Sequence, residues 1–185
     1  MTDHKPFSLG ILVGRFQVLH AGHAQMIQTA IDLCGTVGVF VGSSQESGTC
    51  KNPFPYALRE EMLLKLFGDQ IQVFPLPDIG VGNTSAWGDY VLEQVKRRFG
   101  QRPDLLISGK EARRLDWFDS VSGVRIAELY IPKTIDISAS QVRQFLLQDD
   151  RTAWQQYVDP RMHPLYDQLR QAVLASKDNT ATDSI

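Results

Sequence analysis

The 185-residue chain is expected to be an α/β protein with a doubly wound parallel sheet, because three observations predict that class together. Short apolar runs alternate with segments in which apolar residues recur at helical spacing. The first two runs each end at a glycine that opens a turn. Hydrophobic residues make up 43% of the chain and the formal net charge is only −2, which suits a chain that buries its own core. In such sheets ligands bind beyond the carboxyl ends of the strands, so we expect a site in the loops there.

The first half of the chain predicts two units in which a strand is followed by a helix. Residues 9–13 form an apolar run, and the apolar spacing over residues 22–33 predicts a helix after the intervening turn. Residues 37–41 form a second apolar run rich in β-branched side chains, and a helix is expected over residues 56–67 after a polar segment.

The second half continues the alternation. A third strand is expected over residues 71–76 and a helix over residues 85–99, where apolar and charged positions alternate at helical period. Two further strands are expected over residues 104–108 and 125–131, and two further helices over residues 140–147 and 162–175. Residues 1–175 are therefore expected to form a single domain. The polar residues 176–185 are expected to be a disordered tail.

Composition argues against several classes of function. The balanced charge and the lack of a Lys/Arg block make nucleic-acid binding unexpected. The first ten residues lack the features of a signal peptide, and no apolar run approaches the roughly 20 residues that span a bilayer. We therefore expect no membrane association and a cytoplasmic location. Cys34 and Cys50 form no CxxC pair, so we expect free thiols and no metal site built from protein ligands.

The most informative segment is the turn after the first expected strand, Gly14-Arg15-Phe16-Gln17-Val18-Leu19-His20-Ala21-Gly22-His23. Two of the chain's four histidines, His20 and His23, stand here at the start of a helix. A helix N-terminus attracts phosphate oxygens through its unpaired N–H groups, and side chains three residues apart lie on one face. A lone histidine in such a place is more often a capping or core residue. Two in one turn favour phosphate binding.

A second segment, Asp136-Ile137-Ser138-Ala139-Ser140-Gln141-Val142-Arg143, follows the last expected strand and opens another helix. Ser138 suits an N-cap, which would satisfy backbone donors. Arg143 lies one turn further on and could reach back to phosphate oxygens. A merely capped helix is the alternative interpretation, and a second anion site is the functional one.

These two segments resemble the two signatures of the nucleotidylyltransferase superfamily, a strand followed by His-x-Gly-His and a later Ile-Ser-x-Ser/Thr-x-x-Arg. The resemblance implies a Rossmann-like fold with C-terminal helices. The middle of the chain is similar to the archaeal-type nicotinamide-nucleotide adenylyltransferases at Gly42-Ser43-Ser44-Gln45-Glu46-Ser47, Asn52-Pro53-Phe54, Asp78-Ile79, Asn83 and Trp87. That family implies transfer of an adenylyl group from ATP to nicotinamide mononucleotide, which gives NAD and pyrophosphate by in-line attack on the α-phosphate.

The resemblance also implies roles for individual residues. Catalysis would involve His20, His23, Arg143 and Lys51. ATP would contact Gly14, Arg15, Phe16, Gln17, His20, His23, Gly109, Ile137, Ser138, Ser140 and Arg143. The nicotinamide nucleotide would contact Asp78, Asn83 and Trp87, with Trp87 stacked on the ring. Mg²⁺ would be held mainly by the ATP phosphates, and the resemblance suggests a homo-oligomer.

Three alternatives stay open at this point. The acceptor could be phosphopantetheine or flavin mononucleotide, or the enzyme could be a cytidylyltransferase for a phosphorylated alcohol. A protein of another class, a non-catalytic nucleotide-sensing module, could keep the same fold. Trp87 could also be a core residue, because Tyr90, Val91 and Val95 follow it at helical spacing.

Overall fold

The computed structural model describes residues 4–109, 117–118 and 126–182, without the side chains of residues 178–182. Its centre is a five-stranded sheet in the order β3-β2-β1-β4-β5, in which every neighbouring pair is parallel. The strands are β1 (Phe7–Gly14), β2 (Cys34–Gly42), β3 (Gln72–Leu76), β4 (Leu105–Ser108) and β5 (Ala127–Tyr130). The predicted doubly wound α/β class is therefore confirmed.

The strand order changes direction between β1 and β4. From β1 the chain builds outward through β2 to β3, and it then crosses back to place β4 on the other side of β1. Such a reversal leaves a crevice at the carboxyl ends of the two central strands, where open α/β sheets bind their ligands. The turn that begins at Gly14 leaves β1 at that point.

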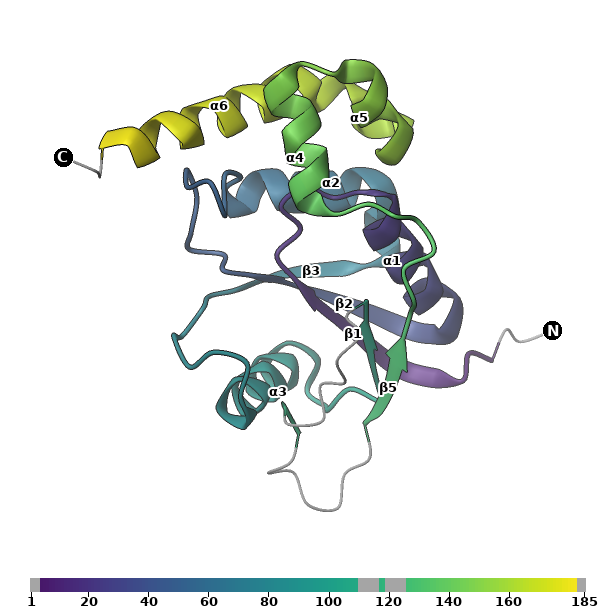
Figure 1. Cartoon of the computed structure of the whole chain (residues 1–185). Helices are drawn as coiled ribbons and strands as arrows, with labels where there is room; N and C mark the ends of the chain where they lie inside the picture. The colour runs from purple at the N-terminus through teal and green to yellow at the C-terminus, as the bar shows by residue number, and fades with distance from the viewer. Residues whose placement is uncertain (1–3, 110–116, 119–125, 183–185) are drawn as a thin grey trace.

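Helices cover both faces of the sheet (Figure 1). On one face, α1 (Ala21–Leu33) and α2 (Tyr56–Phe67) pack on alternate strand residues such as Leu12 and Val39. On the other face, α3 (Ser85–Phe99) packs on Leu9, Ile11 and Phe40 through its own Val91 and Val95. Side chains of a strand alternate between faces, so one apolar strand supplies both cores.

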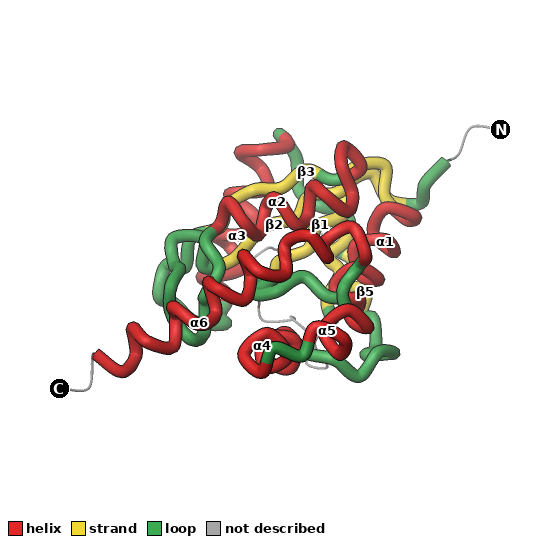
Figure 2. The backbone as a smooth tube through the Cα atoms, turned by 90° about the horizontal axis from the view of Figure 1, so that it is seen from above, coloured by secondary structure: helices red, strands yellow, loops and turns green. Residues whose placement is uncertain are grey.

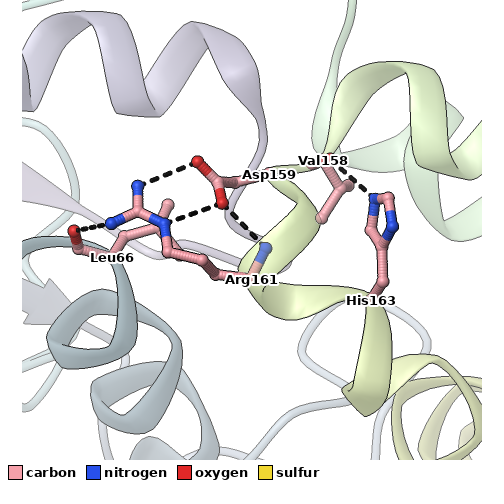
Figure 3. Close-up of polar contacts among 5 residues, drawn as sticks. All are labelled: Leu66, Val158, Asp159, Arg161 and His163. Atoms are coloured by element: carbon pink, nitrogen blue, oxygen red, sulfur yellow. Dashed lines mark hydrogen bonds and ion pairs between the residues drawn. The ribbon is translucent and has the colours of Figure 1, made fainter.

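The C-terminal helices form one block that lies over α2 (Figures 1 and 2). We call α4 (Ala139–Gln148), α5 (Arg151–Tyr157), the 3₁₀ turn Pro160–Leu165 and α6 (Tyr166–Thr182) the C-terminal block. Arg161 donates to the carbonyl oxygen of Leu66 at the end of α2, at 2.7 Å, and is held by the carboxylate of Asp159 (Figure 3). His163 donates through Nε2 to the carbonyl oxygen of Val158 at the end of α5.

Two expectations for this end of the chain need correction. The helix expected over residues 162–175 starts at Tyr166, because Pro160 and Pro164 hold the preceding residues in a 3₁₀ turn. It also continues to Thr182, so residues 176–182, expected to be disordered, are helical. Ser176 is buried, and its carbonyl oxygen accepts from the Sγ of Cys50 at 3.5 Å, which ties the helix to the segment after β2 beyond the expected end. In the described part of the chain no helix has both the length and the apolar character that crossing a bilayer requires.

Candidate active site

A cavity of about 590 Å³ lies at the carboxyl ends of β1, β2 and β4, in the crevice that the strand order creates. This is the usual size of a small-molecule site. Most of the predicted site residues line it, namely Gly14, Arg15, Phe16, Gln17, His20, His23, Asp78, Trp87, Gly109, Ile137, Ser138, Ser140 and Arg143. Two segments far apart in the sequence therefore meet around one space, as the motifs predict.

Two predicted residues do not belong to this lining. Lys51 is exposed on the polar segment after β2, outside the residues that line the cavity. Asn83 is also outside the lining, but its side-chain oxygen accepts a hydrogen bond from the indole nitrogen of Trp117, which does line the cavity.

His20 and His23 form a close, tilted pair of rings at the start of α1. Their ring centroids lie 3.9 Å apart with an interplanar angle of 31°, and the carbonyl oxygen of His20 accepts from the backbone of Ala24 as the first helical bond. The Nδ1 atoms of both rings are buried and have no hydrogen-bond partner in the described part of the chain. Buried polar atoms are normally paired, so these two nitrogens indicate that a polar ligand completes the site.

Both histidines are neutral in the free protein. Burial, followed by the positive charge of Lys133, lowers the pKa of His20 from 6.5 to about 4. Burial also lowers the pKa of His23, with a smaller contribution from His20, against a hydrogen bond to the backbone of Val18 that raises it. A neutral imidazole donates from one nitrogen and accepts at the other. The pair can therefore donate to phosphate oxygens, and its pKa values would rise when anionic phosphate arrives.

Phe16 and Gln17 line the cavity and also shape the turn after β1. The ring of Phe16 is buried and lies 5.1 Å from the His23 ring, between centroids. The side-chain amide of Gln17 donates to the carbonyl oxygen of Phe54 at 3.0 Å and accepts from its N–H at 2.9 Å. The contact of Gln17 with ATP stays a prediction, and its polar end also holds the segment after β2 against the first turn.

Arg143 joins the two motifs directly. Ser138 is the N-cap of α4, as predicted, since its hydroxyl oxygen accepts from the backbone of Gln141 at 3.3 Å. Arg143, one turn later, donates to the carbonyl oxygen of Gln17 and to the hydroxyl of Ser140 at 3.2 Å. Burial lowers the pKa of Arg143, and the charge of Arg15 lowers it further. Two guanidinium groups are thus close enough to repel each other beside the cavity, an arrangement that an anionic ligand would relieve.

Arg59 is a buried residue that the sequence analysis missed. Its guanidinium on α2 is fully buried and donates to the carbonyl oxygens of Arg15, Gly42 and Ser43 at 3.0, 2.8 and 3.1 Å. Burial lowers its pKa to about 10, so it keeps its charge at neutral pH. This one side chain fixes the turns after β1 and β2 relative to each other. The signal was present, because Arg59 occupies a position of the apolar face formed by Met62, Leu63 and Leu66.

An aromatic group forms the other end of the cavity. Trp87 is half-buried, and its ring lies edge-to-face with Trp117 at 6.3 Å between centroids. Gly88 makes this possible, because a Cβ atom there would lie 1.6 Å from the carbonyl oxygen of Trp117. Trp87 therefore both packs in the core and faces the cavity. Trp117 was not predicted, and no pattern around it in the sequence marks it.

The charge of the lining suits a polyanion. Among the described lining residues the permanently charged side chains are Arg15, Lys133 and Arg143, against a single carboxylate, Asp78. No group of three or more His, Cys, Asp or Glu side chains that could hold a metal occurs in the described ranges. The arrangement can bind a chain of phosphates at one end and a planar ring at the other.

Comparison with known families agrees with this arrangement. The sequence profile of the family described as cytidylyltransferase-like matches residues 11–145, a span that contains both motifs and most of the cavity. The chain belongs to this family.

Within it, the sequence is similar to nicotinamide-nucleotide adenylyltransferases. That of Thermococcus kodakarensis is 35% identical over 94 residues, which cover 48% of this chain and 49% of the relative. That of Saccharolobus solfataricus is 38% identical over 90 residues, covering 45% and 51%. That of Thermococcus sibiricus is 28% identical over 155 residues, covering 80% and 77%. Aligned residues span about half the length of the first two relatives.

Solved structures show the same fold. A bifunctional NMN adenylyltransferase/ADP ribose pyrophosphatase from Francisella tularensis, complexed with AMP and a manganese ion, superposes with a TM-score of 0.74 at 19% identity. The match covers 95% of this chain and 54% of that one. The NadR protein in complex with NAD and AMP-PNP gives a TM-score of 0.58, also at 19% identity. Structural similarity at 19% sequence identity establishes the fold alone.

Proposed function

We propose that the protein transfers the adenylyl group of ATP to nicotinamide mononucleotide, which forms NAD and releases pyrophosphate. The observation that carries the proposal is the meeting of the two phosphate-binding motifs in one cavity, where the paired imidazoles of His20 and His23 have unpartnered nitrogens. The names of the similar archaeal proteins support the choice of acceptor.

The reaction needs no nucleophilic side chain. An oxygen of the acceptor's 5′-phosphate forms a new bond to the α-phosphorus of ATP while the bond from that phosphorus to the bridging oxygen of the β-phosphate breaks. The bonding electrons leave with pyrophosphate. Catalysis of such a displacement consists of alignment and of stabilising charge on the equatorial and leaving oxygens. Hydrogen-bond donors that are already in place supply the second effect.

Different hydrogen-bond donors of the cavity would contact different parts of the triphosphate. His20 and His23 would donate to the triphosphate at the N-terminus of α1, where the helix dipole adds to the attraction. Arg143, with Ser138 and Ser140 at the start of α4, would hold the β- and γ-phosphates that leave. Gly14 and Arg15 would border the nucleotide from the turn after β1, while Phe16 and Gln17 keep that turn in shape. Gly109 would border the adenosine.

The acceptor would lie at the aromatic end. Trp87 would stack on the nicotinamide ring, and Asn83, oriented by Trp117, would lie beside it. Asp78, which also lines the cavity, would contact the acceptor as predicted. Lys51 stays a predicted catalytic residue that the free structure keeps outside the lining, so its contribution would require the segment after β2 to approach the phosphates.

A divalent metal ion, which we propose to be Mg²⁺, fits the cavity only as a companion of the phosphates. Among the residues that the structure describes, the lining offers one carboxylate, Asp78, and a few hydroxyl groups, which is too small a set of oxygen ligands for a protein-built site. Bound there through phosphate oxygens, the ion would neutralise charge on the triphosphate. A homo-oligomer and a cytoplasmic location stay predictions, and light scattering of the purified protein tests the first.

The test is a panel of acceptors. Pyrophosphate release is followed with ATP and Mg²⁺ in the presence of nicotinamide mononucleotide, phosphopantetheine, flavin mononucleotide or no acceptor, and with CTP replacing ATP. We expect release only with ATP and nicotinamide mononucleotide. Release with another acceptor would keep the chemistry and overturn the substrate. Tight nucleotide binding with no release in any mixture would favour a nucleotide-sensing module.

A further inference from the structure

Lys133 is a charged residue of the cavity that neither motif includes. It lies on the segment between β5 and α4, and its side chain lines the cavity. Both sides of this segment are anchored. The backbone of Ile131 donates to the carbonyl oxygen of Ser108 at 2.9 Å, and the hydroxyl of Thr134 donates to the side chain of Gln25 on α1 at 2.7 Å. Lys133 is thus held next to the helix whose N-terminus carries the histidine pair.

Lys133 lines the same cavity as the histidine pair. Its charge is close enough to His20 to lower the pKa of that imidazole, second only to burial. Of the other cations in the described lining, Arg143 is committed to two protein oxygens, whereas Arg15 is exposed and makes one long hydrogen bond. Arg15 donates to Asn52 at 3.4 Å, and Arg143 donates to Gln17 and Ser140.

The partner of Lys133 is a weak one. Its Nζ donates to Oδ1 of Asp136 at 2.9 Å, but the two side chains are 50% and 96% exposed. Exposed ion pairs three residues apart contribute little to stability, so the pair can open at small cost. Lys133 is therefore a cation of the described lining whose partner an arriving anion could replace at small cost.

We propose that Lys133 binds the polyphosphate of the nucleotide and that it exchanges its partner Asp136 for the ligand. The inference deepens the proposed function, because it adds a phosphate-contacting residue to the same site. It also assigns a role to Asp136, which competes with the ligand for the ammonium group and so weakens binding in the wild-type protein.

If the ion pair between Lys133 and Asp136 is purely structural, a different pattern of changes in binding affinity is expected. If the pair serves only to shape the segment between β5 and α4, removal of either partner disturbs the same segment, and both changes act on binding in the same direction. If the pair exchanges, removal of Lys133 weakens binding while removal of Asp136 strengthens it. The opposite signs separate the two interpretations without a structure of the complex.

The experiment is calorimetric titration of the intact protein with inorganic tripolyphosphate and, separately, with ATP and Mg²⁺. Four variants are compared, Lys133→Met, Asp136→Asn, the double variant and the control Lys65→Met, which removes an exposed lysine of α2 outside the cavity. We expect Lys133→Met to weaken binding about fivefold, the upper range for an exposed charge pair. Asp136→Asn should strengthen binding about twofold, and the double variant should match Lys133→Met because the competitor has no lysine to hold.

Each other outcome is decisive. Weaker binding in both single variants, or no change in Lys133→Met, would overturn the exchange while the proposed function stands if the wild type still makes NAD. Tripolyphosphate binding that depends on Lys133 in a protein that makes no NAD would overturn the proposed function and leave the inference in place. A wild type that binds neither tripolyphosphate nor ATP would overturn both.

Discussion

His20 and His23 differ from the other basic groups in the described lining of the cavity in that folding keeps them uncharged. Two imidazolium rings with centroids 3.9 Å apart would repel each other, and burial already disfavours the charged form. The free site therefore offers neutral hydrogen-bond donors. It does not add two further positive charges to a lining that already carries Arg15, Lys133 and Arg143. Phosphate binding would supply the negative charge that makes protonation of the pair favourable.

We predict that His23→Ala loses activity far more than stability. The variant removes a donor to the reacting phosphates, which costs about 10²–10³-fold in rate when such a donor is removed from an enzyme. His163→Ala is the matched control, since His163 contacts Val158 in the C-terminal block and not the cavity. Pyrophosphate release and thermal unfolding are measured for both. Near-wild-type turnover in His23→Ala would remove His23 from the mechanism.

We predict that His20 makes the fold less stable in mild acid. Because folding lowers its pKa from 6.5 to about 4, the unfolded chain binds a proton in that interval that the folded protein does not. The contribution of His20 to the free energy of unfolding therefore falls as the pH falls from about 6.5 to about 4. Urea unfolding of the wild type and of His20→Gln at about pH 7 and about pH 4.5 measures it. The variant should lose less stability between the two conditions, and an equal loss would contradict the lowered pKa.

At the scale of elements, the strands and the main helices were predictable because their apolar residues follow a regular pattern along most of each segment. α2 and α3 match their expected bounds, and the two motifs lie at the starts of α1 and α4. The short helix α5 was missed because most of its seven residues are polar, although Asp150 caps it by accepting from the backbone of Ala153 at 2.9 Å. The strand expected over residues 125–131 is β5 (Ala127–Tyr130) in the structure, and residue 125 lies outside the described residues.

Site residues that belong to a sequence motif were predictable, and residues that only packing brings to the cavity were not. His20, His23 and Arg143 belong to short patterns with a chemical meaning. Trp117 and Lys133 reach the cavity only because β4, β5 and α3 are neighbours in space, which spacing along the chain does not reveal. The opposite holds for Lys51, whose place in a sequence pattern does not bring it to the lining.

We predict that Arg59→Met destabilises the protein by at least about 3 kcal/mol, because hydrogen bonds to a charged group contribute about 1.5–3 kcal/mol each and three carbonyl oxygens lose their donor. The control Arg97→Met removes an exposed pair with Glu93 on α3, and about 0.5 kcal/mol is expected there. Urea unfolding measures both variants. A similar small loss in the two would show that Arg59 does not hold the turns after β1 and β2.

At the scale of the whole molecule, two parts of the structure that lie far apart in the sequence line the cavity. The sheet with α1 supplies the histidine turn, and the C-terminal block supplies Ser138, Ser140 and Arg143 at the start of α4. The block is held together by Trp154, which is fully buried and lies edge-to-face with Tyr166 at 5.1 Å between ring centroids. It is joined to α2 through Arg161 and Leu66 (Figure 3).

We predict that Trp154→Ala destabilises the protein by about 3–5 kcal/mol, the usual cost of truncating a buried aromatic side chain. The loss should loosen α4 against α6 and so weaken ATP binding even under conditions where the variant is still folded. Trp154→Phe keeps an aromatic ring and should be much less affected. Urea unfolding and ATP titration are measured together. A destabilised Trp154→Ala protein with wild-type ATP affinity would mean that the block does not position the phosphate donors.

The proposed activity is the transfer of adenylate from ATP to nicotinamide mononucleotide by residues of one cavity. The most direct test is to incubate the wild type and His23→Ala with Mg²⁺, nicotinamide mononucleotide and ATP radiolabelled at the α-phosphate, and to separate the products by chromatography. We predict that the wild type moves the label into NAD and that His23→Ala does so far more slowly. Label that stays in ATP, or that appears only in AMP or ADP, would contradict the claim.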